Sequence, residues 1–232
     1  MTTVDPRSFD HLPAVFDRFA ELVGGPLLDY LAERMPPRAG RAVDLGCGGG
    51  QHAELFAGHY DEVLGVDVSA PMLDLARTRR AHSNVRYEQR DLLEVTPAAD
   101  GTFDLVFSAY ALHHVADLEQ ALLRIRALTR PGGQVILVDN ADPRRQVPRR
   151  WFKAEARKGL VSDLRHRRRP LREAVEVYRL STDPGWLDHL TSDVFLTPAE
   201  FDALYAAVFP GSRISELYRA RAVHWDNRTG PG

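Results

Sequence analysis

Short apolar runs alternate with amphipathic helical segments between residues 41 and 138, and this alternation limits the possible folds more than any other feature. Strands are predicted at 41–45, 63–66, 85–88, 103–107 and 135–138. Helices are predicted from Gln51, after Ser69 and from Leu118, with Ser69 as a helix N-cap. Strands that alternate with helices at this spacing form a parallel sheet covered on both faces.

The two ends of the chain extend this pattern. Two helices are predicted over 12–22 and 27–35, and Thr197 to Glu200 is a capping box that begins a late helix. Strands at 212–218 and 222–227 are joined by a short connection, which implies an antiparallel hairpin. We therefore predict an α/β fold: a doubly wound, seven-stranded, mostly parallel sheet with an antiparallel C-terminal hairpin and a helical lid.

The chain is predicted to be a single domain of residues 1–232. Its expected parts are an N-terminal helical lid (1–40), a cofactor-binding core (41–141), a helical insertion (142–196), and the last helix with the hairpin (197–232). Cys47 is the only cysteine, so no intrachain disulfide can form, which suggests a reducing compartment and a cytoplasmic protein. No signal peptide and no apolar run of membrane-spanning length is found, so no membrane partner is expected.

A glycine-rich turn, Asp44-Leu45-Gly46-Cys47-Gly48-Gly49-Gly50, follows the first predicted strand. Glycines at this point let the backbone turn tightly and approach a ligand. The dinucleotide fingerprint G-x-G-x-x-G fails, because Gln51 stands where its last glycine would be. A phosphate-binding P-loop is excluded too, because no G-K-[ST] follows. A cofactor turn or an ordinary tight turn between strand and helix remains.

Four further stretches follow the glycine turn in a familiar order. They are Val63 to Ser69 with an acid at the strand end, Arg90-Asp91-Leu92, Phe103 to Val115, and Arg130-Pro131-Gly132-Gly133, which is predicted as the turn before the fifth strand. Together with the turn they resemble the class I S-adenosylmethionine-dependent methyltransferases, of the small-molecule type similar to the methyltransferase domain 11 and 25 groups. The resemblance is close from residue 31 to 139 and implies the Rossmann-like methyltransferase fold.

The resemblance implies S-adenosyl-L-methionine as the cofactor and assigns its binding residues. Asp67 would hold the ribose hydroxyls and Asp91 the adenine amino group, because carboxylates accept hydrogen bonds. The full expected set is Asp44, Gly46, Cys47, Gly48, Gly50, Asp67, Val68, Met72, Asp91, Leu92 and Ser108. Alternatives stay open: Asp67 could serve only the helix dipole, Asp91 could cap the next turn, and Met72 and Leu92 could be core residues. No metal is expected.

Methyl transfer from a sulfonium needs positioning above all, so a dedicated catalytic residue is optional. A base is needed when the acceptor must lose a proton early. His113 and His114, after the fourth strand, are the candidates for that role, although one of them could instead pack against or cap the next helix. His189 and Tyr178, in the insertion, could reach the pocket from above.

Residues 144–172 contain twelve Lys or Arg opposed only by Glu155 and Asp163. This basic segment could be a solvated helical face, an approach for an anionic small molecule, or an RNA-binding surface. Few aromatic residues, a pI of about 6.5 and no appended RNA-binding module argue against nucleic acid. A buried apolar stripe is expected in the same segment, comprising Trp151, Phe152, Leu160, Val161 and Leu164.

These observations predict an enzyme that methylates a small-molecule acceptor at oxygen, nitrogen or carbon. The acceptor could be anionic, and the protein is expected to be a monomer or a homodimer. Two other functions stay open. One is an RNA methyltransferase that uses the basic segment, and the other is a non-methylating or non-catalytic protein that binds the same cofactor.

Overall fold

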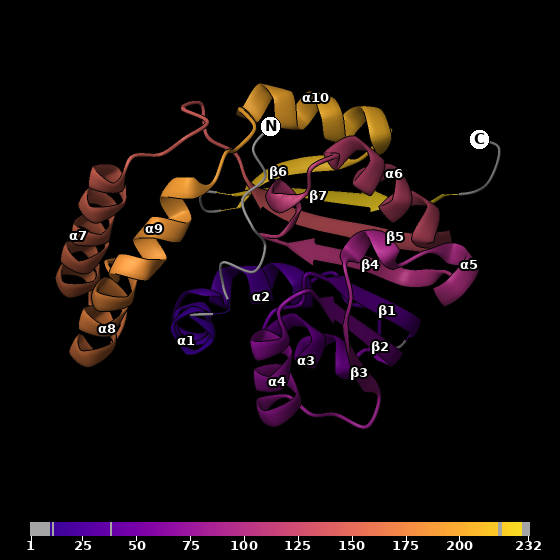
Figure 1. Cartoon of the computed structure of the whole chain (residues 1–232), viewed down its shortest axis with the longest axis horizontal. Coiled ribbons are helices and arrows are strands. Elements are labelled where there is room, and N and C mark those ends of the chain that lie inside the picture. The colour runs from indigo at the N-terminus through magenta and orange to yellow at the C-terminus, as the bar shows by residue number, and fades with distance from the viewer. Residues whose placement is uncertain (1–9, 11, 38, 218–219, 229–232) are drawn as a thin grey trace.

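A computed structural model describes residues 10, 12–37, 39–217 and 220–228. Its centre is a seven-stranded sheet in the order β3-β2-β1-β4-β5-β7-β6 (Figure 1). The strands are β1 (Ala39–Leu45), β2 (Tyr60–Asp67), β3 (Val85–Gln89), β4 (Phe103–Ala109), β5 (Thr129–Asn140), β6 (Arg213–Leu217) and β7 (Ala220–Asp226). The first five are parallel, and β7 runs antiparallel to both β5 and β6. The predicted fold class is therefore confirmed.

Helices cover both faces of the sheet, on opposite sides in Figure 1. On one face α2 (Gly25–Ala32) and α3 (Gln51–Ala57) pack against Phe107 and Ile136. On the other, α6 (Leu118–Leu128) and α10 (Pro198–Val208) pack against Val106 and Leu137. Neighbouring strand residues face opposite sides, so an apolar run such as 105–107 is buried throughout.

Side-chain caps begin three helices, and those of the first two below were predicted from the sequence. The Ser69 hydroxyl accepts a hydrogen bond from the Met72 N–H at the start of α4 (Ala70–Arg79), which lies beside β3. Thr197 and Glu200 form both hydrogen bonds of a capping box at the start of α10. Asp117 caps α6 in the same way. These caps satisfy N–H groups that the first turn of a helix leaves open.

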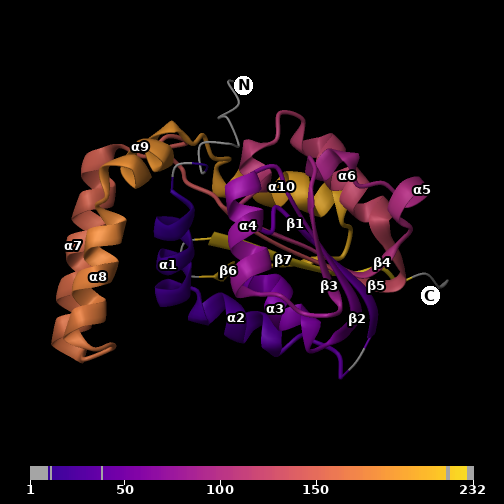
Figure 2. The ribbon, with the colours of Figure 1, turned by 60° about the horizontal axis from the view of Figure 1, so that its bottom comes forward.

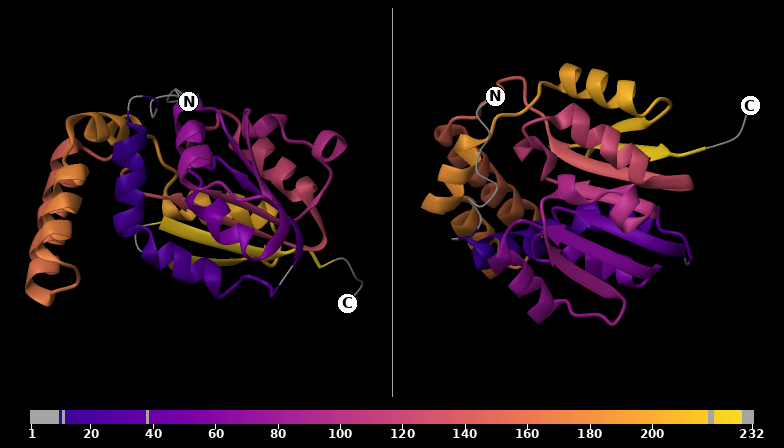
Figure 3. Two further views of the ribbon diagram at one scale, coloured as in Figure 1. Left: turned by 90° about the horizontal axis from the view of Figure 1, so that it is seen from below. Right: turned by 45° about the vertical axis from the view of Figure 1, so that its right-hand side comes forward.

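Four helices lie beside the carboxyl ends of the central strands. They are α1 (Pro13–Val23), α7 (Arg149–His166), α8 (Leu171–Ser181) and α9 (Pro184–Ser192). Helices α7 and α8 lie side by side, and α1 lies between them and α4 (Figures 2 and 3). Arg18 on α1 donates to Glu176 on α8 at 2.7 Å. Among the helices described, none is long and apolar enough to cross a membrane.

Two local predictions were wrong. Val161 and Leu164 do not belong to a buried stripe, because they are 60% and 47% exposed. Helix α7 packs mainly on α8 and α9, so its other faces meet solvent. Pro131 to Gly133 do not precede the fifth strand as a separate turn but lie inside β5. The register of β5 against β4 shifts there, and Gly132 has a φ of 78°. Residues 141–148 connect β5 to α7, residues 167–170 connect α7 to α8, and residues 182–183 connect α8 to α9.

Candidate functional site

A cavity of about 790 Å³ lies at the carboxyl ends of the central strands. Gly46, Asp67, Ala109 and Asn140, at or just after the ends of β1, β2, β4 and β5, line one wall. The order of strands reverses between β1 and β4, and open α/β sheets bind ligands at such a point. Helices α1, α7, α8 and α9 contribute the facing wall.

The glycine turn forms the floor of this cavity. Gly46, Gly48 and Gly50 have φ values of 78°, 50° and 82°, a region that favours glycine. A Cβ at Gly46 would overlap the Cβ of Ala111. The N–H groups of Gly46 and Cys47 donate to the Val66 carbonyl, at 2.8 and 2.9 Å. The turn is therefore fixed against the end of β2 and cannot readily accept a side chain.

Asp67 connects the turn to the helix that follows β2. Its Oδ2 accepts a hydrogen bond from the Gly48 N–H at 2.8 Å, and its Oδ1 accepts from the Ser69 N–H at 2.9 Å. Burial raises the pKa of Asp67, and these N–H groups oppose the rise. Each oxygen keeps a further lone pair, so the carboxylate can still accept from a ligand hydroxyl.

The remaining predicted residues on the cavity wall lie on either side of Asp67. Val68, Met72, Asp91 and Leu92 all line it, as do Gly46, Cys47 and Gly48. Asp91 is exposed and its Oδ1 accepts from the Leu93 N–H at 2.8 Å, which caps the short helix η2 (Leu92–Glu94). The capping alternative for Asp91 is thus realised, and a ligand-binding role stays compatible with it.

Asp44, Gly50 and Ser108 lie behind the wall rather than on it. The Ser108 hydroxyl donates to the Leu45 carbonyl at 2.7 Å, which joins β4 to β1. Asp44 is fully buried, and no described group makes a hydrogen bond of normal geometry to its carboxylate. Burial, with the charge of Asp67, raises the pKa of Asp44 to about 8, and the Ala53 N–H offsets only part of that rise.

His113 is held between two carboxylates. It lies in η3 (Leu112–His114), its Nδ1 is 2.6 Å from Asp139 Oδ1, and its backbone N–H donates to Asp139 Oδ2 at 2.9 Å. Its Nε2 is 3.8 Å from Asp193 Oδ2. Burial opposes protonation, but Asp139 and Asp193 together raise the pKa of His113 to about 10. His113 is therefore already protonated at neutral pH and is a poor general base.

Asp193, His114 and His189 complete this polar cluster on the cavity wall. Asp193 follows α9, and its Oδ2 is also 3.8 Å from His189 Nε2. Burial favours a higher pKa for Asp193, but its contact with His113 and the histidine charges hold that pKa below its ordinary value. Burial and the charge of His113 lower the pKa of His114 to about 4, so His114 is neutral at pH 7.

Three of these side chains could also hold a metal ion. One ligand atom each of His113, His114 and Asp193 lies within 4.8 Å of the other two. Asp139 on the other ring nitrogen of His113 is an arrangement that metal-binding histidines share. The sequence-based expectation of no metal therefore stays a prediction.

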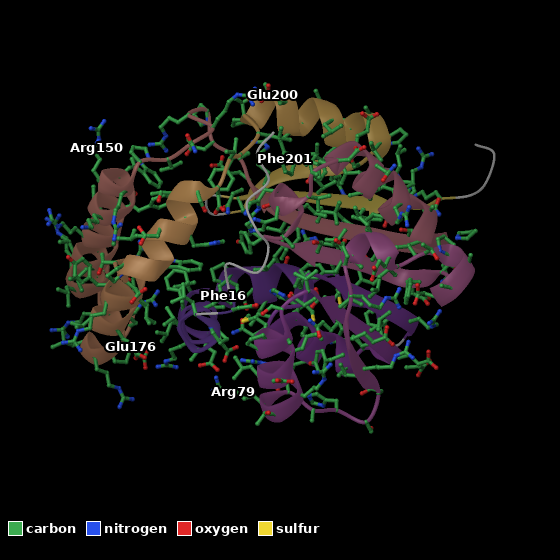
Figure 4. The ribbon with its side chains drawn as sticks, in the orientation of Figure 1. Phe16, Arg79, Arg150, Glu176, Glu200 and Phe201 are labelled. Atoms are coloured by element: carbon green, nitrogen blue, oxygen red, sulfur yellow. The ribbon has the colours of Figure 1, made fainter. Side chains whose placement is uncertain are left out.

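The cavity wall formed by α1, α7, α8, α9 and the segment after α9 is rich in apolar side chains. Only three of them, from the predicted stripe on α7, were expected from the sequence. These side chains of the wall are Phe16, Phe19, Trp151, Phe152, Leu160, Val177, Trp186, Leu190 and Phe195. No Lys or Arg of the basic segment lines the cavity. Arg150, for example, is exposed and projects away from the rest of the molecule (Figure 4).

Comparison with known proteins is consistent with this geometry. Residues 43–137 match a family model described as a methyltransferase domain. A trans-aconitate 2-methyltransferase of Variovorax paradoxus is 36% identical over 149 residues, which is 63% of this chain and 56% of that protein. A ubiquinone biosynthesis O-methyltransferase of Sodalis glossinidius is 35% identical over 144 residues, 57% of this chain and 58% of that protein. The chain thus spans little more than half the length of these relatives.

Solved structures share the fold. The structure titled as a DhpI–SAH complex has a TM-score of 0.64 at 24% identity and covers 98% of this chain and 94% of that one. A methyltransferase from Mesorhizobium loti, described as S-adenosylmethionine-dependent, has a TM-score of 0.59 at 20% identity, with 88% and 99% covered. At these identities the likeness concerns the fold alone.

Proposed function

We propose that the protein is an S-adenosyl-L-methionine-dependent methyltransferase that acts on a small-molecule acceptor, because residues 43–137 match the family model of a methyltransferase domain. The proposal combines the family match with a large cavity at the point where the sheet order reverses. The names of the relatives include both trans-aconitate and ubiquinone biosynthesis, so they do not fix the acceptor.

The position of Asp67 is the observation that carries the proposal. Its carboxylate lies at the end of β2, hydrogen-bonded to the glycine turn and facing the cavity. Such a group accepts hydrogen bonds from a ribose diol, while Asp91 suits an amino group and Met72 an apolar ring. The glycine turn lets the backbone approach the rest of the cofactor closely. The donors and acceptors present therefore fit S-adenosyl-L-methionine.

We propose that positioning supplies most of the rate acceleration. The bound cofactor supplies an electrophilic methyl group on sulfur. This chain would orient the acceptor between the helices of the lid and the ends of the strands, and exclude water. His113 pairs with Asp139 and Asp193 and does not remove a proton from the acceptor, because it is itself protonated at neutral pH.

Titration calorimetry tests cofactor binding. S-adenosylhomocysteine should bind the parent protein, and Asp67→Ala should weaken it by at least about tenfold, since a hydrogen bond to a charged group contributes roughly 1.5–3 kcal/mol. Asp74→Ala is the matched control, because Asp74 is an exposed residue of α4 that pairs with Arg77. The control should bind as the parent does.

Two results would count against the proposal. One is no heat with either the cofactor or its demethylated form. The other is equal affinity in the parent and in Asp67→Ala. Formation of S-adenosylhomocysteine in the presence of an acceptor, followed by mass spectrometry, separates an enzyme from a protein that only binds the cofactor.

A further inference from the structure

The lid half of the cavity is built for an apolar ligand. Phe16 and Phe19 on α1 pack against Trp186 on α9, with ring centroids 5.7 and 5.6 Å apart. Phe195 closes the same region against His113 at 5.3 Å. A wall so rich in aromatic rings favours a flat, apolar body, because aromatic rings pack well against one another.

The charges on the cavity wall disfavour an anion. Among the described residues that line the cavity, Arg90 is the one Lys or Arg, and it already pairs with Asp100 and Glu88. The His113 ring offers no open cation either, since it lies between Asp139 and Asp193. An anionic acceptor would meet carboxylates rather than an open cation, and an uncompensated buried charge is costly.

Asp193 is the polar group on this wall that needs a further partner. The residue is only 1% exposed, and its Oδ1 has no hydrogen-bond partner among the described residues. Its Oδ2 is 3.8 Å from both His113 and His189, beyond normal hydrogen-bond distance. A buried carboxylate oxygen left in this state is unfavourable, and a ligand donor would satisfy it.

We infer that the methyl acceptor is a largely aromatic molecule without an anionic group that presents an O–H or N–H group to Asp193. This inference rests on the proposed function and names its substrate class. It replaces the expectation of an anionic acceptor that the basic segment suggested. Asp193 is thereby a specificity-determining residue, supplied by the lid rather than by the sheet.

Three probes with one ring system test the inference by titration calorimetry. They are 2-naphthol, which has a hydroxyl donor, 2-methoxynaphthalene, which has none, and 2-naphthoate, which is anionic. All are titrated into the parent protein saturated with S-adenosylhomocysteine, in the presence of EDTA. We expect 2-naphthol to bind about tenfold or more tightly than either of the others, since it alone can satisfy the carboxylate.

Variants test whether Asp193 causes the tighter binding of 2-naphthol. Asp193→Asn should weaken 2-naphthol by about tenfold and leave 2-methoxynaphthalene unchanged, because only the hydroxyl uses the carboxylate. Asp188→Asn is the control, since Asp188 lies on α9 as well but is exposed and pairs with Arg149. It should bind all three probes as the parent does. The order of affinities in the parent decides the inference even if Asp193→Asn does not fold.

Several results would overturn the inference. They are equal or tighter binding of 2-naphthoate, no difference between 2-naphthol and its methyl ether, or a 2-naphthol affinity that Asp193→Asn leaves unchanged. Binding of 2-naphthol that appears only when Zn²⁺ replaces EDTA would also overturn it, in favour of a metal at His113, His114 and Asp193. Failure of S-adenosylhomocysteine itself to bind would instead refute the proposed function, so the two failures are distinguishable.

Discussion

At the scale of single residues, Asp44 is a group whose ionisation opposes folding. It is fully buried under the glycine turn, and its pKa is raised from 3.8 to about 8. Between these values the folded protein keeps the proton while the unfolded chain has lost it. A rise in pH therefore favours unfolding, and the stability that protonation provides is fully present only below about pH 4.

Asp44→Asn should remove this dependence. From about pH 5 to 6.5 the free energy of unfolding of the parent, measured with urea, should fall relative to that of the variant. The relative loss is at most about 1.4 kcal/mol per pH unit. The difference between the two proteins cancels the titration of groups that both share, His113 among them. Parallel pH profiles would show that Asp44 is not protonated in the folded state.

The residues of the site differ in how far sequence can predict them. Asp67 ends an apolar strand, and Gly46 and Gly48 lie where the backbone conformation favours glycine, so a motif locates them. Asp193 directly follows the last residue of α9, and no sequence motif surrounds it. Its role arises because the fold brings His113, from a distant part of the chain, next to Asp193 and His189. The spacing of residues in the sequence does not predict such a contact.

At the scale of elements, a buried ion pair fixes α1 to the glycine turn. Asp17 is 1% exposed and accepts hydrogen bonds from Arg79 and Arg80. Arg80 also donates to the Gly49 carbonyl at 2.8 Å, and the Gln51 side chain donates to the Asp17 carbonyl at 3.0 Å. The N-terminal helix is thereby coupled to the turn that we propose binds the cofactor.

Asp17→Ala should therefore destabilise the protein strongly. It leaves the buried Arg80 without its main partner, and removing one member of a buried pair costs roughly 3–5 kcal/mol. Urea denaturation should show this loss, and the affinity for S-adenosylhomocysteine should fall as the turn loosens. Asp29→Ala, on the exposed side of α2, should leave both quantities unchanged. An unchanged denaturation midpoint in Asp17→Ala would show that other contacts hold α1.

The strands of the sheet could be predicted from the sequence, whereas the buried positions of α7 could not. Buried parallel strands are near-continuous apolar runs, and Leu105 to Phe107 show this directly. Helix α7 is polar on most of its surface, because it packs only on part of one side, so apolar periodicity misplaced Val161 and Leu164. We propose that α1, α7, α8 and α9 act together as the lid of a single domain.

At the scale of the whole molecule, the basic residues of the chain's most charged segment lie on the surface and not at the cavity. The basic segment holds twelve Lys or Arg within 144–172, yet none of them lines the cavity. Several pair with exposed carboxylates, including Arg149 with Asp188 and Arg145 with Glu200. Exposed charges that do not line the cavity are screened by salt, so their effect on the affinity for a ligand inside it is small.

Ligand binding should therefore depend little on ionic strength. Between about 50 and 300 mM NaCl the affinities for S-adenosylhomocysteine and 2-naphthol should change by less than about twofold, whereas a protein that neutralises several phosphates loses orders of magnitude. The double variant Arg167→Glu/Arg168→Glu, in the exposed turn between α7 and α8, should bind both ligands as the parent does. Transfer of labelled methyl groups to RNA that falls steeply with salt, and falls again in this double variant, would instead make the basic segment a nucleic-acid surface. The apolar lid would then cover a base rather than a free small molecule.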